Sequence, residues 1–289
     1  MLGRAVRALA AIGRRIPLPI GRALGRAIGA LAWHVARRER RKALANIAIA
    51  FPEWPEAERR RAIRGMFRHL GMSLFETVWL LNMDEARRAR LITIENVDAL
   101  LRYLREGRGV IAITGHCGNW EWAANVVANL GYPLTVLQRE RTEEGVNEVV
   151  AAVRAAGNIR TIDRGSTAAA REMIQAIRGG GMLAFLVDQN IRAESVKVPF
   201  FGRPAPTPIG PAKLAIRTEA VIAPIFIERR GSMQYVRFVD PLETARGDDP
   251  VAVTAWMTAR IEEQIRRAPE QWVWMHDRWK ERPKWDVTP

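Results

Sequence analysis

The chain is poor in the residues that build disulfides and zinc sites. Its 289 residues include one cysteine, Cys117, and four histidines. A single cysteine excludes an intramolecular disulfide and a cysteine-rich zinc site, and it favours a reducing, cytoplasmic setting. The histidines, at positions 34, 69, 116 and 276, lack the spacing of metal ligands, and the H-E-x-x-H pattern is absent. The sequence therefore predicts that no metal is bound.

Long apolar runs are also missing. Arg22 and Arg26 interrupt the apolar segment 20–36, so no stretch reaches the roughly 18 uncharged residues of a spanning helix. A secretory signal peptide is disfavoured, because arginines recur through the apolar region and no small-residue cleavage site follows. Residues 1–36 instead predict an amphipathic segment in the membrane interface, whose arginines reach lipid phosphates. An ordinary amphipathic helix packed on the domain is the alternative.

Acidic residues are outnumbered, with 31 Asp and Glu against 45 Lys and Arg, which gives a formal charge of +14. Such an excess favours an anionic partner or environment. Nucleic acid, anionic lipid and an acidic carrier protein would each fit the basic clusters at residues 37–42, 59–61 and 87–90. The chain contains no recognisable nucleic-acid-reading module. A basic nucleic-acid-binding protein therefore stays as an alternative from a different class.

The hydrophobic periodicity divides the chain into two regions, without internal repeats or low-complexity segments. Residues 1–90 are predicted to be helical, with helices at 40–49 and 56–81. Residues 91–289 alternate strand-like apolar runs with helical stretches, which predicts one continuous α/β domain. Strands are expected at 92–94, 109–114, 134–137, 160–162, 182–187, 221–228 and 234–238. Helices are expected at 97–106, 120–130, 144–156, 166–177, 211–218 and 251–267, and residues 200–208 are interpreted as a rigid, proline-rich loop.

The most informative motif runs from His116 to Glu121, directly behind the apolar run 109–114. On one helix an offset of five residues rotates two side chains by roughly 140°, so they would point apart. They meet only if His116 lies in a strand-to-helix loop and Glu121 in the first turn of the helix. Glycines on both sides permit a sharp loop, and Asn119 is a good N-cap. His116 is then a candidate general base for a hydroxyl, oriented by Glu121.

Other readings of these residues stay open. A single histidine after a strand is more often structural than catalytic, and Cys117 offers a rival nucleophile that nothing else in the chain supports. Asp188 and Gln189 end the apolar run 182–187, where open α/β sheets place ligands. Asp188 also has an alternative as a simple loop cap.

Together these motifs resemble the bacterial lipid A biosynthesis acyltransferases of the late lauroyl- and myristoyltransferase type, and the related phosphatidylinositol mannoside acyltransferases. The likeness covers nearly the whole chain from Asn46 onward. It is carried by His116 with Glu121, by Asp188-Gln189, by the Val-Pro-Phe-Phe-Gly block at 198–202, and by the tail at 269–280.

The resemblance implies an αβα sandwich of glycerolipid-acyltransferase type behind a helical, membrane-associating N-terminus. Its members act at the cytoplasmic face of the cell inner membrane, here through peripheral attachment. They move a fatty acyl chain from acyl carrier protein, or acyl-CoA, onto a hydroxyl of a lipid A precursor or a related glycolipid. His116 would deprotonate that hydroxyl and Glu121 would hold the ring, with no metal or organic cofactor. A phosphatidylinositol mannoside acyltransferase using acyl-CoA is the alternative, and no nucleic-acid partner is expected.

The resemblance also implies which residues face the substrate. Arginines near the thioester would bind phosphate or brace the loop around the thioester oxygen. For Arg154 the alternative is an ordinary solvated charge on a helix surface. The phenylalanine block either lines an acyl pocket or packs the core and makes a turn. The expected substrate-binding residues are Asn119, Arg139, Arg154, Arg164, Asp188, Gln189, Phe200 and Gly202.

Overall fold

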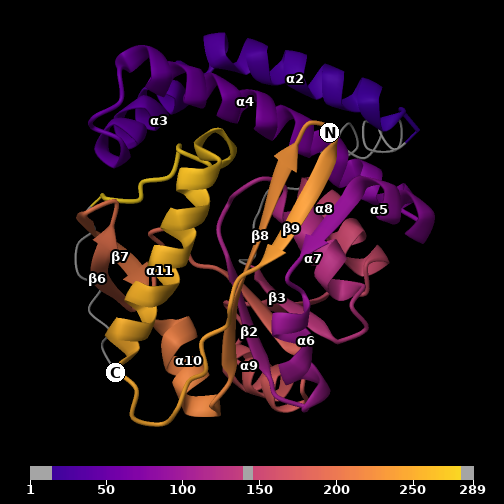
Figure 1. The fold of residues 1–289 in the computed structure, drawn as a ribbon, viewed down its shortest axis with the longest axis vertical. Coiled ribbons are helices and arrows are strands. Elements are labelled where there is room, and N and C mark those ends of the chain that lie inside the picture. Colours follow the sequence, from indigo (N-terminus) through magenta and orange to yellow (C-terminus); the bar gives the residue numbers. More distant parts are fainter. Residues whose placement is uncertain (1–14, 139–145, 281–289) are drawn as a thin grey trace.

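The computed structural model describes residues 15–138 and 146–280, which form a mixed α/β fold (Figure 1). Its centre is a seven-stranded sheet in the order β1-β9-β8-β2-β5-β3-β4, and every neighbouring pair is parallel except β8 and β9. The predicted α/β class is confirmed. The strands are β1 (Ile92–Glu95), β2 (Val110–Thr114), β3 (Leu134–Gln138), β4 (Arg160–Asp163), β5 (Met182–Leu186), β8 (Val221–Arg230) and β9 (Met233–Phe238).

Strand β2 lies at the middle of the sheet and is apolar along its length, because helices cover both of its faces. Successive side chains of a strand point to opposite faces. Val110 and Ala112 join a core cluster with helices α6 and α7, whereas Ile111 and Ile113 join a second cluster with α10 and α11. The covering helices are α6 (Asp98–Arg105), α7 (Trp120–Ala128), α8 (Val146–Ala156), α9 (Ala169–Arg178), α10 (Gly210–Thr218) and α11 (Pro250–Arg267).

The described part of the N-terminal region is helical and lies along one edge of the molecule (Figure 1). Helix α2 packs on α4 through glycines. A Cβ atom on Gly25 would lie 2.3 Å from the carbonyl oxygen of Gly71, and one on Gly29 would lie 2.1 Å from that of Phe67. Only glycine permits this close backbone approach. The elements are α2 (Leu18–Val35), α3 (Arg37–Ala50), α4 (Glu56–Trp79), the 3-10 helix η1 (Leu80–Asn82) and α5 (Glu85–Leu91).

The outer face of α2 is apolar, because its first arginine turns inward. Arg22 is buried and donates to Glu76 of α4 at 2.7 Å. The prediction that this arginine reaches lipid phosphates is therefore wrong, since a buried carboxylate holds it. Arg26 approaches the sulfur of Met72. The exposed outer face carries Ile20, Leu24, Ile28, Leu31 and Val35. Among the described residues, no helix is both long and apolar enough to cross a bilayer.

Residues 195–208 form a separate hairpin of β6 (Ser195–Phe200) and β7 (Arg203–Pro208), although the sequence predicted a rigid loop over residues 200–208. Proline lacks an N–H and disfavours a central strand, but β7 belongs to a two-stranded sheet with a free edge. Phe201 and Gly202 turn the chain with positive φ angles of 51° and 69°. The hairpin lies against α11 (Figure 1).

Candidate active site

The loop after β2 has the form that its sequence predicted. His116 lies in this loop and α7 begins at Trp120. Asn119 caps the helix, with its side-chain oxygen accepting from the backbone N–H of Trp122 at 3.2 Å. Gly118 has a φ of +58°, and a Cβ there would meet the carbonyl oxygen of Ile227 at 2.5 Å. Only glycine meets both demands without strain.

The C-terminal tail holds this loop in place. Cys117 and Trp272 form an antiparallel bridge. The backbone N–H of Gly118 donates to the Gln271 carbonyl at 2.8 Å, and that of Val273 donates to the His116 carbonyl at 3.2 Å. The tail is therefore part of the site, since it fixes the backbone from the His116 carbonyl to Gly118.

Asp188 is the carboxylate that contacts the His116 ring. His116 Nδ1 lies 2.8 Å from Asp188 Oδ1, and the backbone N–H of His116 donates to Oδ2 at 2.7 Å. Trp272 Nε1 donates to the same Oδ2 at 2.8 Å. The pairing follows from the sheet. Thr114 of β2 is in register with Leu186 of β5. His116 and Asp188 each lie two positions further along, so both follow the carboxyl ends of neighbouring strands at the same edge of the sheet.

The Asp188 carboxylate is ionised although it is 1 % exposed. Burial alone would raise its pKa. The charge of His116, with the hydrogen bonds from its ring and backbone N–H, outweighs burial and holds the pKa of Asp188 well below its usual value. In the neutral form of His116, the ionised Asp188 carboxylate holds the remaining ring proton on Nδ1 and leaves the lone pair on Nε2. His116 can therefore accept a proton at Nε2.

Glu121 is bound by Arg154 rather than by the histidine. Arg154 donates from Nη2 to Oε1 at 2.6 Å and from Nε to Oε2 at 3.0 Å, a bidentate ion pair with little exposure. In the described chain, the ring of His116 has Asp188 and Gln189 as its hydrogen-bonding partners. The contact predicted between Glu121 and His116 is therefore not formed. The loop-and-helix arrangement that it required is present, but the first turn of α7 directs the carboxylate toward α8.

A second histidine lies beside the first. Gln189 Nε2 is 3.0 Å from His116 Nε2 and 3.0 Å from His276 Nε2. The two imidazole rings lie 4.9 Å apart between centroids. Burial, and then the charge of His116, lowers the pKa of His276 to about 4, so this ring is neutral at pH 7. No role was predicted for His276; its place in the tail motif at 269–280 was the one signal in the sequence.

Near the His116 loop, a narrow apolar cavity lies between α7 and the sheet. Trp120, Glu121 and Arg154 line it together with residues of β2, β3 and β5. The Trp120 ring packs edge-on against His116, with centroids 4.8 Å apart. An apolar cavity with a few polar groups in its lining suits a ligand with a hydrocarbon chain and a polar head.

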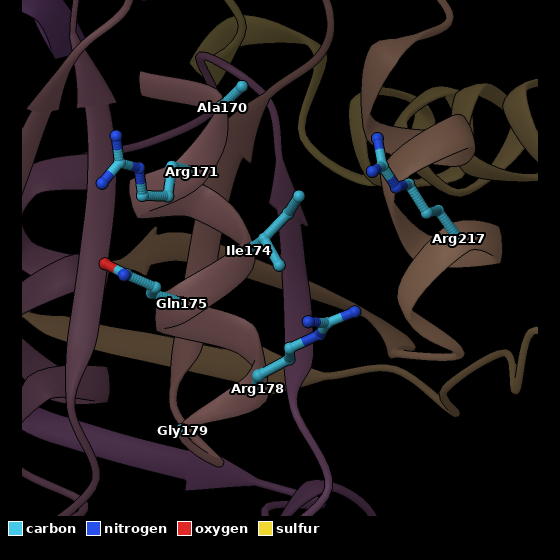
Figure 2. Close-up of a pocket in the computed structure, with 7 residues that line it drawn as sticks. All are labelled: Ala170, Arg171, Ile174, Gln175, Arg178, Gly179 and Arg217. Atoms are coloured by element: carbon cyan, nitrogen blue, oxygen red, sulfur yellow. The ribbon is translucent and has the colours of Figure 1, made fainter. Parts of the chain in front are cut away.

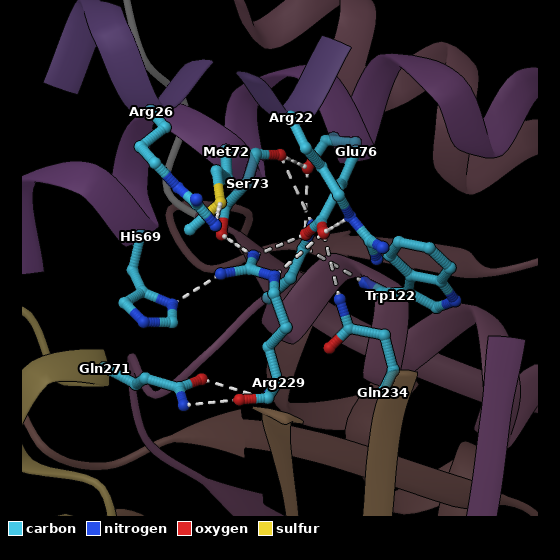
Figure 3. A network of polar contacts seen from close by, with 12 residues as sticks. Arg22, Arg26, His69, Met72, Ser73, Glu76, Trp122, Arg229, Gln234 and Gln271 are labelled. Atoms are coloured by element: carbon cyan, nitrogen blue, oxygen red, sulfur yellow. Dashed lines mark hydrogen bonds and ion pairs between the residues drawn. The ribbon is translucent and has the colours of Figure 1, made fainter. Parts of the chain in front are cut away.

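Asn119 is buried between the His116 loop and α4 and joins the two by hydrogen bonds. Its Nδ2 donates to the Ser73 carbonyl and to Glu76 Oε2, both at 3.3 Å. Glu76 is the centre of a larger buried network (Figure 3). It accepts from Arg22, from Gln234 at 3.1 Å, and from Arg229 at 2.6 and 2.9 Å. Asn119 was expected to bind substrate, but its side chain is committed to α4 and to the start of α7.

The remaining predicted residues have these positions. Arg139 lies outside the described residues, and Arg164 lies in the turn after β4. Phe200 is fully buried against Trp272 and Trp279, which favours the core-packing alternative. Gly202 serves the hairpin turn. Cys117 is buried, and burial first and then Asp188 raise its pKa well above the usual value, so it is a thiol and a poor nucleophile.

Another depression, with a volume of about 660 Å³, lies between α9 and α10. Figure 2 shows Arg171 and Arg178 on α9, and Arg217 on α10, arranged around Ile174. The groove runs along α9 from Ala170 to Gly179, and its lining includes neither His116 nor Asp188. It holds none of the predicted site residues. Across residues 15–138 and 146–280, no cluster of histidine, cysteine and acidic side chains suits a metal.

A family model described as bacterial lipid A biosynthesis acyltransferase matches residues 4–281. The protein is thus an acyltransferase with a mixed α/β fold. It belongs to the bacterial lipid A biosynthesis acyltransferase family, as its motifs indicated. This assignment weighs against the nucleic-acid-binding alternative.

Relatives with known names agree with the family. The chain is 29% identical over 272 residues to the lipid A biosynthesis palmitoleoyltransferase of Escherichia coli (strain K12), covering 93% of this chain and 88% of that protein. It is 27% identical over 275 residues to the lipid A biosynthesis lauroyltransferase of the same strain, with the same coverage. The phosphatidylinositol mannoside acyltransferase of Mycolicibacterium smegmatis is 27% identical over 199 residues, covering 68% of this chain and 65% of that protein.

Proposed function

We propose that this protein transfers a fatty acyl chain from an acyl carrier protein thioester to a hydroxyl of a lipid A precursor or a related phosphorylated glycolipid. The observation that carries the proposal is the buried Asp188 carboxylate on His116 Nδ1, which leaves Nε2 as a base. The neighbouring Trp120 lines an apolar cavity. The names of the relatives supply the substrate class.

The chemistry needs one base and no covalent enzyme intermediate. His116 Nε2 takes the proton of the acceptor hydroxyl while its oxygen attacks the thioester carbonyl carbon. Asp188 stabilises the imidazolium through the Nδ1–H bond. The tetrahedral intermediate then expels the thiolate, which takes the proton back from Nε2. The products are the new ester and the free thiol of the donor.

Arg154, which lines the cavity, is proposed to contact the substrate. Glu121 fixes its Nε and Nη2, and Gln138 accepts from Nη1 at 3.2 Å. The guanidinium still has N–H groups to offer, since it carries five donors. In this scheme Glu121 acts through Arg154, and Arg154 contacts the thioester or a phosphate of the acceptor. The narrow cavity takes the first part of the acyl chain.

Peripheral attachment to the cytoplasmic face of the inner membrane is proposed to use the outer face of α2. Five large aliphatic side chains are 44 to 69 % exposed there. Exposed arginines flank the helix at positions 15, 37, 38 and 41, where anionic head groups would lie. A double Leu24→Gln, Leu31→Gln variant should bind phosphatidylglycerol-containing vesicles roughly thirtyfold more weakly, a loss of about 2 kcal/mol. Val251→Gln, which alters an exposed apolar residue on α11, is the matched control.

The direct test of function is acyl transfer by the purified protein. The donor is offered as acyl carrier protein thioester or as acyl-CoA, and the acceptor as a lipid A precursor or a mannosylated phosphoinositide. We expect transfer to the lipid A precursor, with His116→Ala inactive. A preference for the phosphoinositide with acyl-CoA would establish the alternative that the mycobacterial relatives suggest. Unchanged turnover in His116→Ala would contradict the mechanism.

A further inference from the structure

The groove between α9 and α10 carries positive charge that the described part of the chain does not neutralise. Arg171 and Arg178 reach it from α9, and Arg217 reaches it from α10 (Figure 2). All three arginines are exposed, and within residues 15–138 and 146–280 no carboxylate pairs with any of them. Ile174, which is half-buried, lies between the guanidinium groups. The groove therefore suits an anionic ligand that also has an apolar contact to offer.

The acidic side chains close to the groove are already engaged elsewhere. Each of them pairs with a different cation, at 2.5 to 2.9 Å: Glu172 with Arg160, Glu194 with Lys213, and Glu219 with Arg246. These acids are therefore not the partners of the groove arginines. The charge that answers the groove has to come from another molecule.

The spacing of the arginines indicates a ligand larger than one phosphate. Arg171 and Arg178 lie two helical turns apart, so they share one face of α9 and are separated by about 10 Å along its axis. Arg217 faces them from the second helix, across a hollow of about 660 Å³. A partner helix with acidic side chains on successive turns matches this arrangement.

The position of the groove argues against a lipid surface as its ligand. Helices α9 and α10 lie at the opposite end of the molecule from α2 (Figure 1). The outer face of α2 is the proposed membrane face, so a bilayer that binds α2 does not reach the groove. The anionic macromolecule that remains in the proposed reaction is the acidic acyl carrier protein, which approaches from the side away from the membrane.

A short segment connects the proposed base with α10. Asp188 contacts His116, and six residues further along, Glu194 is held at the start of α10. Its carbonyl accepts from the backbone N–H of Ile209 at 3.1 Å, and its carboxylate accepts from Lys213 at 2.5 Å. Six residues span at most about 20 Å. The start of α10 therefore lies within this distance of Asp188, which the flexible phosphopantetheine arm of a carrier protein can span.

We propose that the groove between α9 and α10 is the docking surface for the acyl carrier protein, with an acidic helix of the carrier lying along α9. The inference rests on the proposed function, because it takes the acyl carrier protein thioester as the donor. Arg171, Arg178 and Arg217 bind carboxylates of the carrier, and Ile174 contacts an apolar side chain between them. Exposed charges of this kind speed association, so that loaded carriers replace spent ones quickly.

The test compares two double variants of the full-length protein, with a lipid A precursor as acceptor. Arg178→Glu with Arg217→Glu reverses two charges of the groove. Arg61→Glu with Arg90→Glu reverses two exposed charges on α4 and α5, and is the matched control. The donors are acyl carrier protein thioester and acyl-pantetheine with the same acyl chain, which offers the thioester without the carrier or its phosphate.

The groove variant should lower kcat/KM for the carrier thioester by about 10- to 100-fold, through a higher KM and with kcat unchanged. Transfer from acyl-pantetheine should stay at the wild-type rate in both variants, because this donor does not touch the groove. Added salt should raise the wild-type KM for the carrier thioester and narrow its difference from the groove variant. Titration of the fluorescently labelled carrier without an acyl chain measures the same loss as binding.

Three results would overturn the inference. The groove variant could keep the wild-type KM for the carrier thioester, the control variant could lose as much as the groove variant, or the groove variant could lose transfer from both donors equally. Absence of transfer from either donor in the wild type would contradict the proposed function instead. The binding titration would then still decide whether the carrier docks on the groove.

Discussion

Two buried carboxylates, Asp188 and Glu76, show how similar surroundings serve different ends. Each is at most 1 % exposed and each accepts several hydrogen bonds. The partners of Glu76 include two arginines, whose charge is permanent (Figure 3). The main partner of Asp188 is a histidine, whose second nitrogen lies 3.0 Å from the side-chain nitrogen of Gln189. The group opposite the carboxylate therefore separates a structural anchor from a proposed site of proton transfer.

The largest effect is expected from removing the titratable partner. His116→Ala should lower acyl transfer by about 10³–10⁴, near the upper range for a general base, and should also lower the unfolding midpoint, because the buried Asp188 carboxylate loses its ring partner. His34→Ala is the control, because His34 is exposed on α2. Steady-state kinetics and thermal unfolding of both variants provide the measurement. If His116→Ala kept most of its activity, the pair of His116 and Asp188 would be structural, like the network around Glu76.

Removing the charge of Glu76 should act on stability instead. Glu76→Gln would leave Arg22 and Arg229 buried without a counter-charge, at a cost of about 3–5 kcal/mol. Glu58→Gln on the same helix is the matched control. Glu58 pairs with Arg61 at 3.5 Å on the surface and should matter by less than about 1 kcal/mol. Denaturant unfolding measures both, and equal losses would contradict the anchoring role of Glu76.

Acid should lower the stability of the regions around Glu76 and around Asp188, because each contains a buried histidine that is neutral at pH 7. Burial, with nearby positive charge, lowers the pKa of His69 to about 3 and that of His276 to about 4. Below pH 6.5 the unfolded chain binds protons that these folded histidines do not, so stability falls with pH from about 6.5 to 4. His276→Gln should reduce this fall by about 1–2 kcal/mol. The free energy of unfolding at pH 7 and pH 4.5 tests it; an identical fall in the variant would contradict it.

The smallest effect is expected at Arg22. Two guanidinium groups face one Glu76 carboxylate, and Arg229 holds that carboxylate from two of its nitrogens. Arg22→Met keeps the packing against α4 and leaves a balanced pair, so stability should change by less than about 1 kcal/mol. A loss as large as that of Glu76→Gln would show that both arginines are required. Denaturant unfolding of the two variants, measured together, decides this.

Local features of the site were predictable from sequence, and long-range contacts were not. The apolar run 109–114, the glycines and Asn119 specify a strand, a loop and a capped helix within a few residues. Asp188 lies 72 positions after His116, and Trp272 lies 155 positions after Cys117. Only the order of the strands in the sheet brings them to the loop. The spacing of His116 and Glu121 predicted the backbone correctly but not the direction of the Glu121 side chain. That direction depends on Arg154, which no local pattern connects to the motif.

The hairpin shows a different limit. Three prolines in β7 predicted a loop, because proline removes the N–H groups that a central strand requires. The structure places these prolines in a two-stranded sheet, where one edge needs no donors. Whether a strand is central or at an edge is a property of the whole fold. Proline content alone was therefore a misleading signal here.

The central claim is that Asp188, rather than Glu121, fixes the proton on His116 Nδ1. With four histidines in the chain, selective ¹⁵N labelling of the imidazole rings can measure this directly by NMR. We predict that His116 has a protonated Nδ1 and an unprotonated Nε2 at pH 7.5, that Asp188→Asn abolishes this pattern, and that Glu121→Gln preserves it. A proton on Nε2 in the wild type, or a pattern lost in Glu121→Gln and kept in Asp188→Asn, would contradict the account.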